Sequence, residues 1–288
     1  MTSDHILAND LKELFPYFQE ETGPGPGSFF SIGAEGLTRA SALFQLQPAA
    51  AMSRLLKSDI WPRRFVRNRG VMTAADQARL LESRAAVIGC GGLGGYGVTL
   101  LARVGLGALV LCDRDSFEES NLNRQLLCRE TNLGRNKAEV AAEEIAAISS
   151  HVQLDVWPAE ARTDNLPQIL AGSQIVLDCL DSISARRQVE AAAHQAGLPF
   201  VHGSIAGEEG FATITRPGEK SLSGLYGDEV RTEERNAERS LGVPTVTPAF
   251  LACLQVSLAV RELLGRKPEP DVLYHVDLSV PLMEPLII

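Results

Sequence analysis

The sequence predicts an α/β fold built on a mainly parallel sheet, and three observations support it. The apolar run 85–88 leads directly into glycines spaced Gly-x-Gly-x-x-Gly, at Gly89, Gly91 and Gly94. A helical pattern follows, and then a second apolar run at 108–112. Strand-like and helix-like patterns alternate from there toward the C-terminus, which is typical of βαβ units. We therefore expect a Rossmann-like sheet with helices on both faces.

The N-terminal part differs in composition from the rest and is expected to form a helical extension, residues 1–61. One amphipathic helical segment spans 10–18, and one or two further helices span 40–57. The Gly/Pro-rich run 23–28 is expected to be a linker. The remaining residues, 62–288, are expected to form the α/β domain. The sequence does not indicate what the extension does.

Within the α/β domain, each element is indicated by its own pattern. A capping pattern at Thr73 predicts the start of a helix. The polar, Gly-rich stretch 216–246, with its charged run 228–239, is expected to be a functional or disordered loop. The apolar helix 248–264 is expected to lie in the core. The expected strands are 85–89, 108–113, 152–157, 174–180, 200–205 and 211–215, and the other expected helices are 93–105, 135–149, 163–171 and 183–196.

Composition and charge narrow the class of protein. The chain has 288 residues, of which 45% are hydrophobic and 22% charged, as in a soluble globular protein with a sizeable core. A net charge of −9 argues against a broad nucleic-acid-binding surface. The N-terminus has no signal-peptide pattern, and no apolar run reaches the roughly 18 residues that a membrane span needs. We expect a cytoplasmic protein without membrane association, whose five cysteines are buried free thiols.

The glycine motif predicts a binding site for nucleotide phosphate. Glycines let the backbone approach a phosphate, and the amides at the start of the following helix point toward its charge. Asp113 ends the second strand and is placed to accept hydrogen bonds from ribose hydroxyls. It lies 19 residues after Gly94, the usual position of an NAD-binding acid. These residues alone therefore leave a nicotinamide dinucleotide open.

The polar residues that follow favour a triphosphate instead. Arg124 can hold phosphate oxygens in bidentate fashion, although by itself it is more simply explained as a solvent-exposed arginine. Lys137 lies in the first turn of a helix, where a lysine opposes the helix dipole unless an anion is bound. A surface lysine is the weaker interpretation. Together with Asn121 and Gln125, these residues indicate a site for ATP rather than for a hydride-carrying cofactor.

Asp181 is a candidate ligand of Mg²⁺. It follows the buried strand 174–180, at the sheet edge where ligands bind in open α/β folds. Magnesium prefers a few carboxylates together with phosphate oxygens. Capping of the next helix by Asp181 or Ser182 explains the same residues equally well. His202 ends a later strand, and a structural role is the simpler interpretation of it.

Five separated motifs, in order, resemble those of the ThiF/MoeB/HesA family, bacterial relatives of ubiquitin-activating enzymes. The resemblance covers about 62–288, and the first motif departs from the family pattern, with Phe65 for Tyr and Asn68 for Gln. The matching segments are Arg64–Asn68, Gly89–Gly94, Ser120–Gln125, Gly134–Lys137 and Asp181.

The resemblance implies an enzyme that adenylates the C-terminal Gly-Gly carboxylate of a small ubiquitin-like sulfur-carrier protein and releases pyrophosphate, in sulfur-containing cofactor biosynthesis. It implies a homodimer in which Arg67 reaches the partner's ATP phosphates, and it assigns phosphate contacts to Arg124 and Lys137 and Mg·ATP to Asp181. The implied nucleotide-binding residues are Gly89, Gly91, Gly92, Leu93, Gly94, Asp113, Asn121, Arg124, Gln125 and Lys137.

Departures from the family limit this implication. The two Cys-x-x-Cys pairs that bind zinc in many members are replaced by 221–224 and 251–254, so no structural zinc is expected. The loop 216–246 has no cysteine, and Cys128 is expected to be a packing residue, so adenylation without sulfur transfer is expected. A tRNA threonylcarbamoyladenosine dehydratase and a non-catalytic ATP-binding scaffold remain alternatives. The carrier and its pathway are not identified by the sequence.

Overall fold

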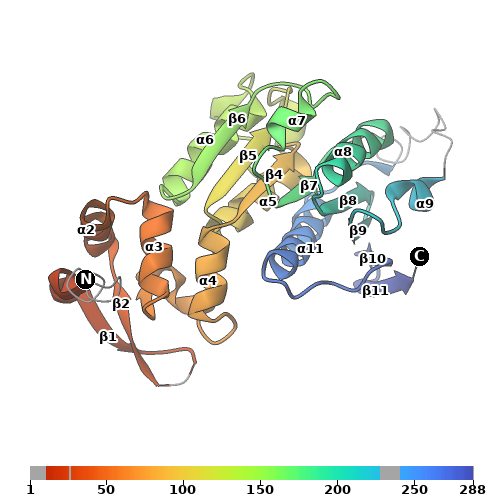
Figure 1. Ribbon diagram of the computed structural model, residues 1–288. Coiled ribbons are helices and arrows are strands. Elements are labelled where there is room, and N and C mark those ends of the chain that lie inside the picture. Colours follow the sequence, from red (N-terminus) through yellow and green to blue (C-terminus); the bar gives the residue numbers. More distant parts are fainter. Residues whose placement is uncertain (1–10, 26, 228–240, 288) are drawn as a thin grey trace. The chain divides into compact units, whose positions relative to one another are not determined.

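The computed structural model describes residues 11–25, 27–227 and 241–287. The contacts within the chain divide it into two compact units. Unit 1 comprises Met1–Ser83 and Val104–Gly107, and unit 2 comprises Arg84–Arg103 and Ala108–Ile288. The domain boundary between residues 61 and 62 stays a prediction. Figure 1 shows the elements of each unit.

Unit 1 combines a small sheet with helices. Strand β1 pairs antiparallel with β2, and β2 pairs parallel with β3. Thr73 caps α4 as expected, because its side chain accepts a hydrogen bond from the Asp76 amide and the Asp76 carboxylate accepts one from the Thr73 amide. The elements are η1 (Phe15–Tyr17), β1 (Phe18–Thr22), β2 (Ser28–Ile32), α2 (Ala34–Phe44), α3 (Pro48–Leu56), β3 (Ile60–Pro62), η2 (Arg63–Asn68) and α4 (Ala74–Leu81).

The N-terminal extension contains helices, as expected, but it also contains the strands β1, β2 and β3, which were not expected. The run 23–28 connects the two strands of a hairpin and is not a linker between helices. Gly25 and Gly27 have positive φ angles of 90° and 71°, which suit a tight reversal of the chain. Arg69 holds this connection, because its guanidinium donates to Pro24 O at 2.7 Å and lies 4.3 Å from the centre of the Phe29 ring.

Unit 2 is built on one eight-stranded sheet in the order β11-β10-β9-β8-β7-β4-β5-β6. The five neighbouring strands β8, β7, β4, β5 and β6 are parallel, as the alternating pattern predicted. At the other edge β8, β9, β10 and β11 pair antiparallel, so the sheet is mixed. The strands are β4 (Arg84–Ile88), β5 (Ala108–Cys112), β6 (Gln153–Trp157), β7 (Ile175–Asp178), β8 (Phe200–Ala206), β9 (Glu209–Thr215), β10 (Val272–Asp277) and β11 (Leu282–Ile287).

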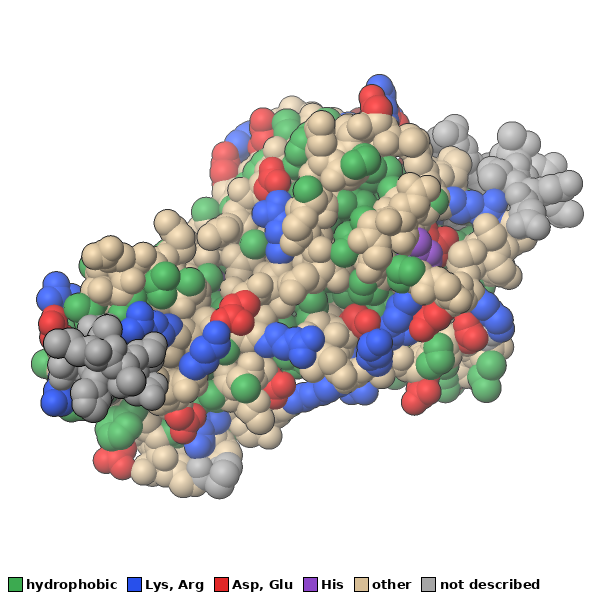
Figure 2. Space-filling model, in the orientation of Figure 1, with side chains coloured by type: hydrophobic (Ala, Val, Ile, Leu, Met, Phe, Trp, Pro, Cys, Tyr) green, Lys and Arg blue, Asp and Glu red, His purple; other side chains and the backbone are tan. Residues whose placement is uncertain are grey.

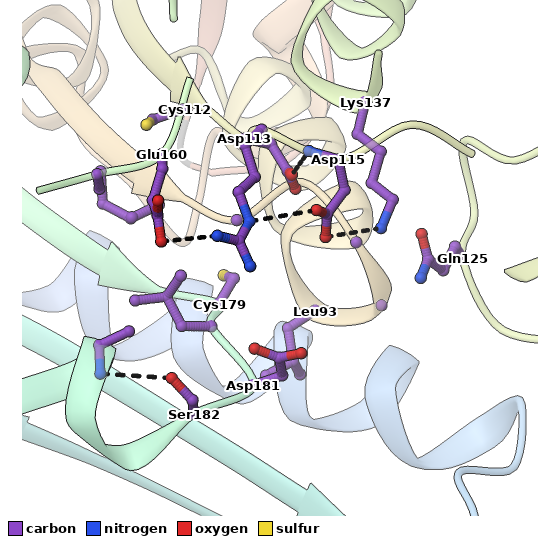
Figure 3. Close-up of a pocket in the computed structure, with 18 of the residues that line it drawn as sticks. Leu93, Cys112, Asp113, Asp115, Gln125, Lys137, Glu160, Cys179, Asp181 and Ser182 are labelled. Carbon is purple, nitrogen blue, oxygen red and sulfur yellow. Dashed lines mark hydrogen bonds and ion pairs between the residues drawn. The ribbon is translucent and has the colours of Figure 1, made fainter. Parts of the chain in front are cut away.

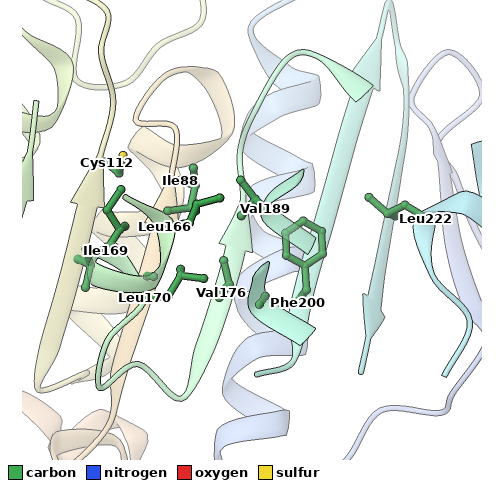
Figure 4. Packing of buried hydrophobic residues seen from close by; sticks show 12 residues of the cluster. Ile88, Cys112, Leu166, Ile169, Leu170, Val176, Val189, Phe200 and Leu222 are labelled. Atoms are coloured by element: carbon green, nitrogen blue, oxygen red, sulfur yellow. The ribbon is translucent and has the colours of Figure 1, made fainter. Parts of the chain in front are cut away.

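Helices cover both faces of this sheet, as expected. On one face α7, α8 and α9 pack over Ile88, Val176 and Phe200 in a fully buried cluster (Figure 4). On the other face α5 approaches Leu177, whose side chain lies 4.0 Å from the position that a Cβ on Gly97 would take. The helices are α5 (Gly92–Val104), α6 (Lys137–Ile148), α7 (Leu166–Ile169), α8 (Ile183–Gln195), α9 (Leu222–Tyr226) and α11 (Val246–Leu263), and the 3-10 turns are η3 (Glu119–Asn121) and η4 (Glu130–Asn132).

Helix α11 and the stretch before it differ in part from expectation. Among the described residues, α11 is one helix that is long and apolar enough to cross a membrane, and 56% of that stretch is buried inside the protein. The predicted loop 216–246 contains α9, and its charged run 228–239 lies outside the described residues. On the face of the molecule in Figure 2, positive and negative side chains are interspersed.

Candidate nucleotide-binding site

A pocket of about 930 Å³ in unit 2 lies at the carboxyl ends of β4, β5 and β7 (Figure 3). Its walls come from the glycine loop after β4, the loop after β5, the start of α6 and the turn between β7 and α8. Gly94 is not part of the lining, and Arg67 belongs to unit 1. The residues singled out from the sequence that line it are Gly89, Gly91, Gly92, Leu93, Asp113, Asn121, Arg124, Gln125, Lys137 and Asp181.

The glycines of the loop serve two different purposes. Gly89 has a φ of 97°, and a Cβ there would lie 2.4 Å from Cys179 O. A Cβ on Gly94 would lie 1.9 Å from Gly89 O, so this glycine is required by backbone packing rather than by a ligand. At Gly91 and Gly92 a Cβ would meet only ordinary contacts, at 3.4 and 3.6 Å. These two residues open the first turn of α5 to the pocket.

Asp113 ties the glycine loop to the end of β5. Its Oδ2 accepts a hydrogen bond from the Cys90 amide at 2.6 Å, and its Oδ1 accepts one from the Asp115 amide at 2.8 Å. Burial raises the pKa of Asp113, and the two amide hydrogen bonds act in the opposite direction. The carboxylate therefore shapes the loop, and Asp113 also lines the pocket.

Lys137 is nearly buried and points into the pocket from the start of α6 (Figure 3). Only 8% of the residue is exposed, and its Nζ lies 3.7 Å from Asp115 Oδ2. Asn136 caps the helix, because its side chain accepts hydrogen bonds from the Ala138 and Glu139 amides at 2.9 and 3.2 Å. Lys137 thus adds a positive charge to a helix end that is already positive, and an anion in the pocket would stabilise it.

Gln125 carries the clearest unsatisfied group of the site. Its Oε1 is buried and has no hydrogen-bond partner within the described part of the chain. A buried acceptor without a partner costs about 1–3 kcal/mol, so a ligand N–H or O–H is the expected partner. Neighbouring Asn121 is also buried, and its Oδ1 accepts from the Glu118 amide at 3.2 Å.

Arg124 lines the pocket and is half-buried. Its guanidinium donates to Ser120 O at 2.8 Å and to Asn123 Oδ1 at 2.9 Å, which leaves further N–H groups for a phosphate. Two long-range hydrogen bonds join the segment beside Arg124 to the segment that contains Val243. Asn123 Nδ2 donates to Val243 O at 3.2 Å, and Thr245 Oγ1 donates to Asn123 O.

Asp181 lies exposed in the turn between β7 and α8 and lines the pocket. Ser182 is the residue that caps α8, because its Oγ accepts from the Ala185 amide at 3.4 Å. Within the described ranges, no group of three or more His, Cys, Asp or Glu side chains forms a complete metal site. Asp181 fits a magnesium ion that takes most of its ligands from nucleotide phosphates and water.

Several pocket residues were not found by sequence reasoning. Arg186 lines the pocket although it is only 3% exposed. Its spacing from buried Val189 and Ala193 places a charge on the buried face of α8, and this pattern was a usable signal. Arg114 and Arg162 also line the pocket, where they form ion pairs with Glu160 at 2.7 and 2.6 Å.

Two cysteines were also missed, because Cys112 and Cys179 line the pocket. Burial raises the pKa of Cys179 well above its ordinary value and that of Cys112 to about 12, so both are protonated thiols at neutral pH and poor nucleophiles. Cys128 is buried but is not part of the lining.

Comparison with known proteins identifies the family of this chain. The model of the ThiF family matches residues 65–281. The SAMP-activating enzyme E1 of Haloferax volcanii is 36% identical over 65% of this chain and 70% of its own length. The molybdopterin-synthase adenylyltransferase of Salmonella typhimurium is 34% identical over 54% of this chain and 65% of its own length. The Escherichia coli adenylyltransferase of the sulfur carrier ThiS is 30% identical over 66% of this chain and 75% of its own length.

Solved structures share the fold over more of the chain. The complex of E. coli MccB with ATP has a TM-score of 0.67 at 17% identity and covers 94% of this chain and 95% of its own. The structure of E. coli tRNA N6-threonylcarbamoyladenosine dehydratase with AMP has a TM-score of 0.60 at 24% identity. It covers 72% of this chain and 96% of its own. The chain therefore belongs to the ThiF family and, like its named relatives, is an adenylyltransferase.

Proposed function

We propose that this chain binds Mg·ATP in the pocket of unit 2 and transfers AMP to the C-terminal Gly-Gly carboxylate of a small ubiquitin-like sulfur-carrier protein. The observation that carries the proposal is the inward Lys137, nearly buried beside a glycine loop, which calls for an anionic ligand. The substrate is inferred from relatives named for SAMP, ThiS and molybdopterin synthase.

The reaction needs positioning and positive charge more than it needs acid–base chemistry. A carboxylate is ionised at neutral pH, so it attacks the α-phosphate directly, and pyrophosphate leaves without a general base. Arg124 and Lys137 hold the phosphates, and Asp113 holds the ribose. Asp181 would hold Mg²⁺, which neutralises the charge that develops on the leaving pyrophosphate. Such preorganised charges stabilise the transition state more than the ground state.

We propose further that the enzyme is a cytoplasmic homodimer. Arg67 is exposed on the 3-10 helix η2 of unit 1. An exposed arginine is available to a second copy, in agreement with the expected role of Arg67 at the partner's ATP. Mixing an Arg67→Ala protein with an Arg124→Ala protein tests this, because one intact site per dimer is expected to restore part of the activity. No recovery in the mixture contradicts action across the interface.

A second candidate substrate, a peptide such as MccA in place of a sulfur-carrier protein, is favoured by the extent of the fold similarity. The named sequence relatives match about two thirds of the chain or less, whereas MccB structures match 94% of it and one of them contains N-formylated MccA. Unit 1 therefore has a counterpart in an enzyme that binds a substrate of another kind. The likeness to the tRNA dehydratase extends over less of the chain, 72%.

ATP–pyrophosphate exchange tests the proposal and separates the two substrates. Exchange is expected with a Gly-Gly-ending carrier of the same organism, and exchange with MccA alone favours the second candidate. Arg124→Ala and Asp181→Asn are expected to abolish exchange. Arg129→Ala is the matched control, since Arg129 forms an exposed ion pair with Glu144 at 2.9 Å and is not part of the pocket. Absence of exchange with every such carrier contradicts the proposal.

A further inference from the structure

A buried chain of polar side chains lies behind the turn that carries Asp181. Asp178, at the end of β7, and His202, on β8, are both fully buried, and neither lines the pocket. Asp178 Oδ2 and His202 Nδ1 are 2.6 Å apart, and His202 Nε2 and the Tyr226 hydroxyl are 2.8 Å apart. The row of hydrogen-bonded side chains therefore runs from β7 through β8 to Tyr226, the last residue of α9.

The protonation of Asp178, His202 and Tyr226 follows from the groups that each of them contacts. Asp178 is beside Arg186, whose Nη1 is 3.8 Å from Asp178 Oδ2, so the two buried charges balance. Burial lowers the pKa of His202, which keeps the ring neutral. A neutral ring has one N–H, and the carboxylate attracts it to Nδ1. Nε2 is then an acceptor, and Tyr226 donates its one hydroxyl proton to it at 2.8 Å. Ser204 Oγ, which lies 3.3 Å from the Tyr226 hydroxyl, is then the donor in that second contact.

The same groups hold the turn that follows β7 from two sides. Asp178 Oδ1 accepts a hydrogen bond from the Leu180 amide at 3.0 Å. Arg186 donates to Leu180 O at 2.5 Å and to Gly203 O at 2.7 Å. Both backbone groups of Leu180 are therefore fixed by a buried charged side chain, and the next residue is Asp181. The orientation of Asp181 thus depends on how Asp178 is held.

Helix α9 is anchored separately at its other end. The Glu190 carboxylate accepts hydrogen bonds from the Leu222 amide at 3.0 and 3.1 Å and from Thr215 Oγ1 at 2.8 Å. Tyr226 is thus presented to His202 by a helix whose first turn is tied to α8. This second anchor offers a control, because it contributes to the stability of α9 without contacting Asp178.

We propose that Asp178, His202 and Tyr226 form a positioning relay that fixes the 178–181 turn and thereby aims Asp181 at the nucleotide-bound magnesium. None of the three touches substrate, and the relay rests on the function proposed above. The relay predicts that a change at Tyr226, on α9, alters the magnesium dependence of ATP binding through Asp181. A residue that only supported the fold would alter stability without this specificity.

Magnesium titration of ATP binding by the intact protein, followed by calorimetry, tests the relay. Tyr226→Phe removes only the hydroxyl and is expected to raise the half-saturating Mg²⁺ concentration about threefold to tenfold, the effect of one lost hydrogen bond. His202→Asn keeps a donor at the Nδ1 position and is expected to behave like Tyr226→Phe. His202→Gln removes that donor, and the half-saturating concentration is expected to rise further.

Thr215→Val is the matched control, because it removes a buried hydrogen bond at the other anchor of α9. It is expected to lower the Tm and to leave the magnesium dependence unchanged. If it shifts the magnesium dependence as Tyr226→Phe does, or if Tyr226→Phe and His202→Gln titrate like the wild type, the relay is overturned while the proposed function stands. If the wild-type protein binds ATP without any dependence on Mg²⁺, both fail.

Discussion

Replacement of Lys137 by methionine is expected to act differently on stability and on ligand binding. The side chain of Lys137 is 10% exposed, and its partner Asp115, at 3.7 Å, is 56% exposed. An ion pair with such an exposed member contributes at most about 1 kcal/mol. A cation in the first turn of a helix costs about 0.3–1 kcal/mol. The two effects nearly cancel, so the free energy of unfolding of the ligand-free protein is expected to change by less than about 1 kcal/mol.

With ATP bound, the same replacement is expected to have a much larger effect. A hydrogen bond that involves a charged group contributes about 1.5–3 kcal/mol, and its loss raises the Kd about 10-fold to 150-fold. Calorimetry measures the Kd, and urea unfolding without nucleotide measures the stability. Lys220→Met is the control, because Lys220 also lies near a carboxylate, 3.9 Å from Asp271 Oδ2, but outside the pocket. Wild-type affinity for Mg·ATP in Lys137→Met would refute the assignment.

A methyl group on Gly94 would lie 1.9 Å from a backbone oxygen, whereas one on Gly97 meets only a side chain at 4.0 Å. Gly94→Ala is therefore expected to lower the Tm strongly and Gly97→Ala little; equal losses would contradict the packing argument. Elemental analysis of the purified protein is expected to find no stoichiometric zinc, and one zinc per chain would show that expectation to be wrong. Burial lowers the pKa of His275, but hydrogen bonds to Glu209 and Glu284 outweigh it and raise the net pKa above 6.5. The stabilisation from His275 is therefore complete below the unfolded pKa and is lost as the pH rises through the folded pKa. His275→Gln is expected to lower the urea midpoint at about pH 5.5 and to change it little at about pH 9; a uniform loss at both would argue against this ion pair.

The parts of the site that could be predicted from sequence depend on local patterns. Gly89 and Gly91 lie between a strand and a helix, and this order alone positions a loop at the carboxyl edge of a sheet. Lys137 was found because a charge in the first turn of an amphipathic helix is energetically unusual. Asp181 was found because it ends a buried apolar run. In each case the signal lies within about ten residues of the group that it predicts.

The parts that were missed depend on contacts between distant segments. The pattern of residues 18–22 and 28–32 did not indicate strands. They form a hairpin because β1 and β2 pair with each other and Arg69 holds the connection between them. Arg186 lines the pocket because its partners at Leu180 and Gly203 hold it there. The link from Asp178 through His202 to Tyr226 joins three elements, β7, β8 and α9, and no spacing in the sequence marks it.

The hydrogen bonds between Asn123 and the segment at Val243 and Thr245 have a consequence for how the protein folds. The two segments are 120 residues apart in the chain, and the elements from β6 to α9 lie between them. Closing so long a loop costs conformational entropy that is repaid only after the intervening strands have paired. The competence to bind nucleotide that we propose is accordingly expected late in folding, after the strands from β6 to β9 have paired.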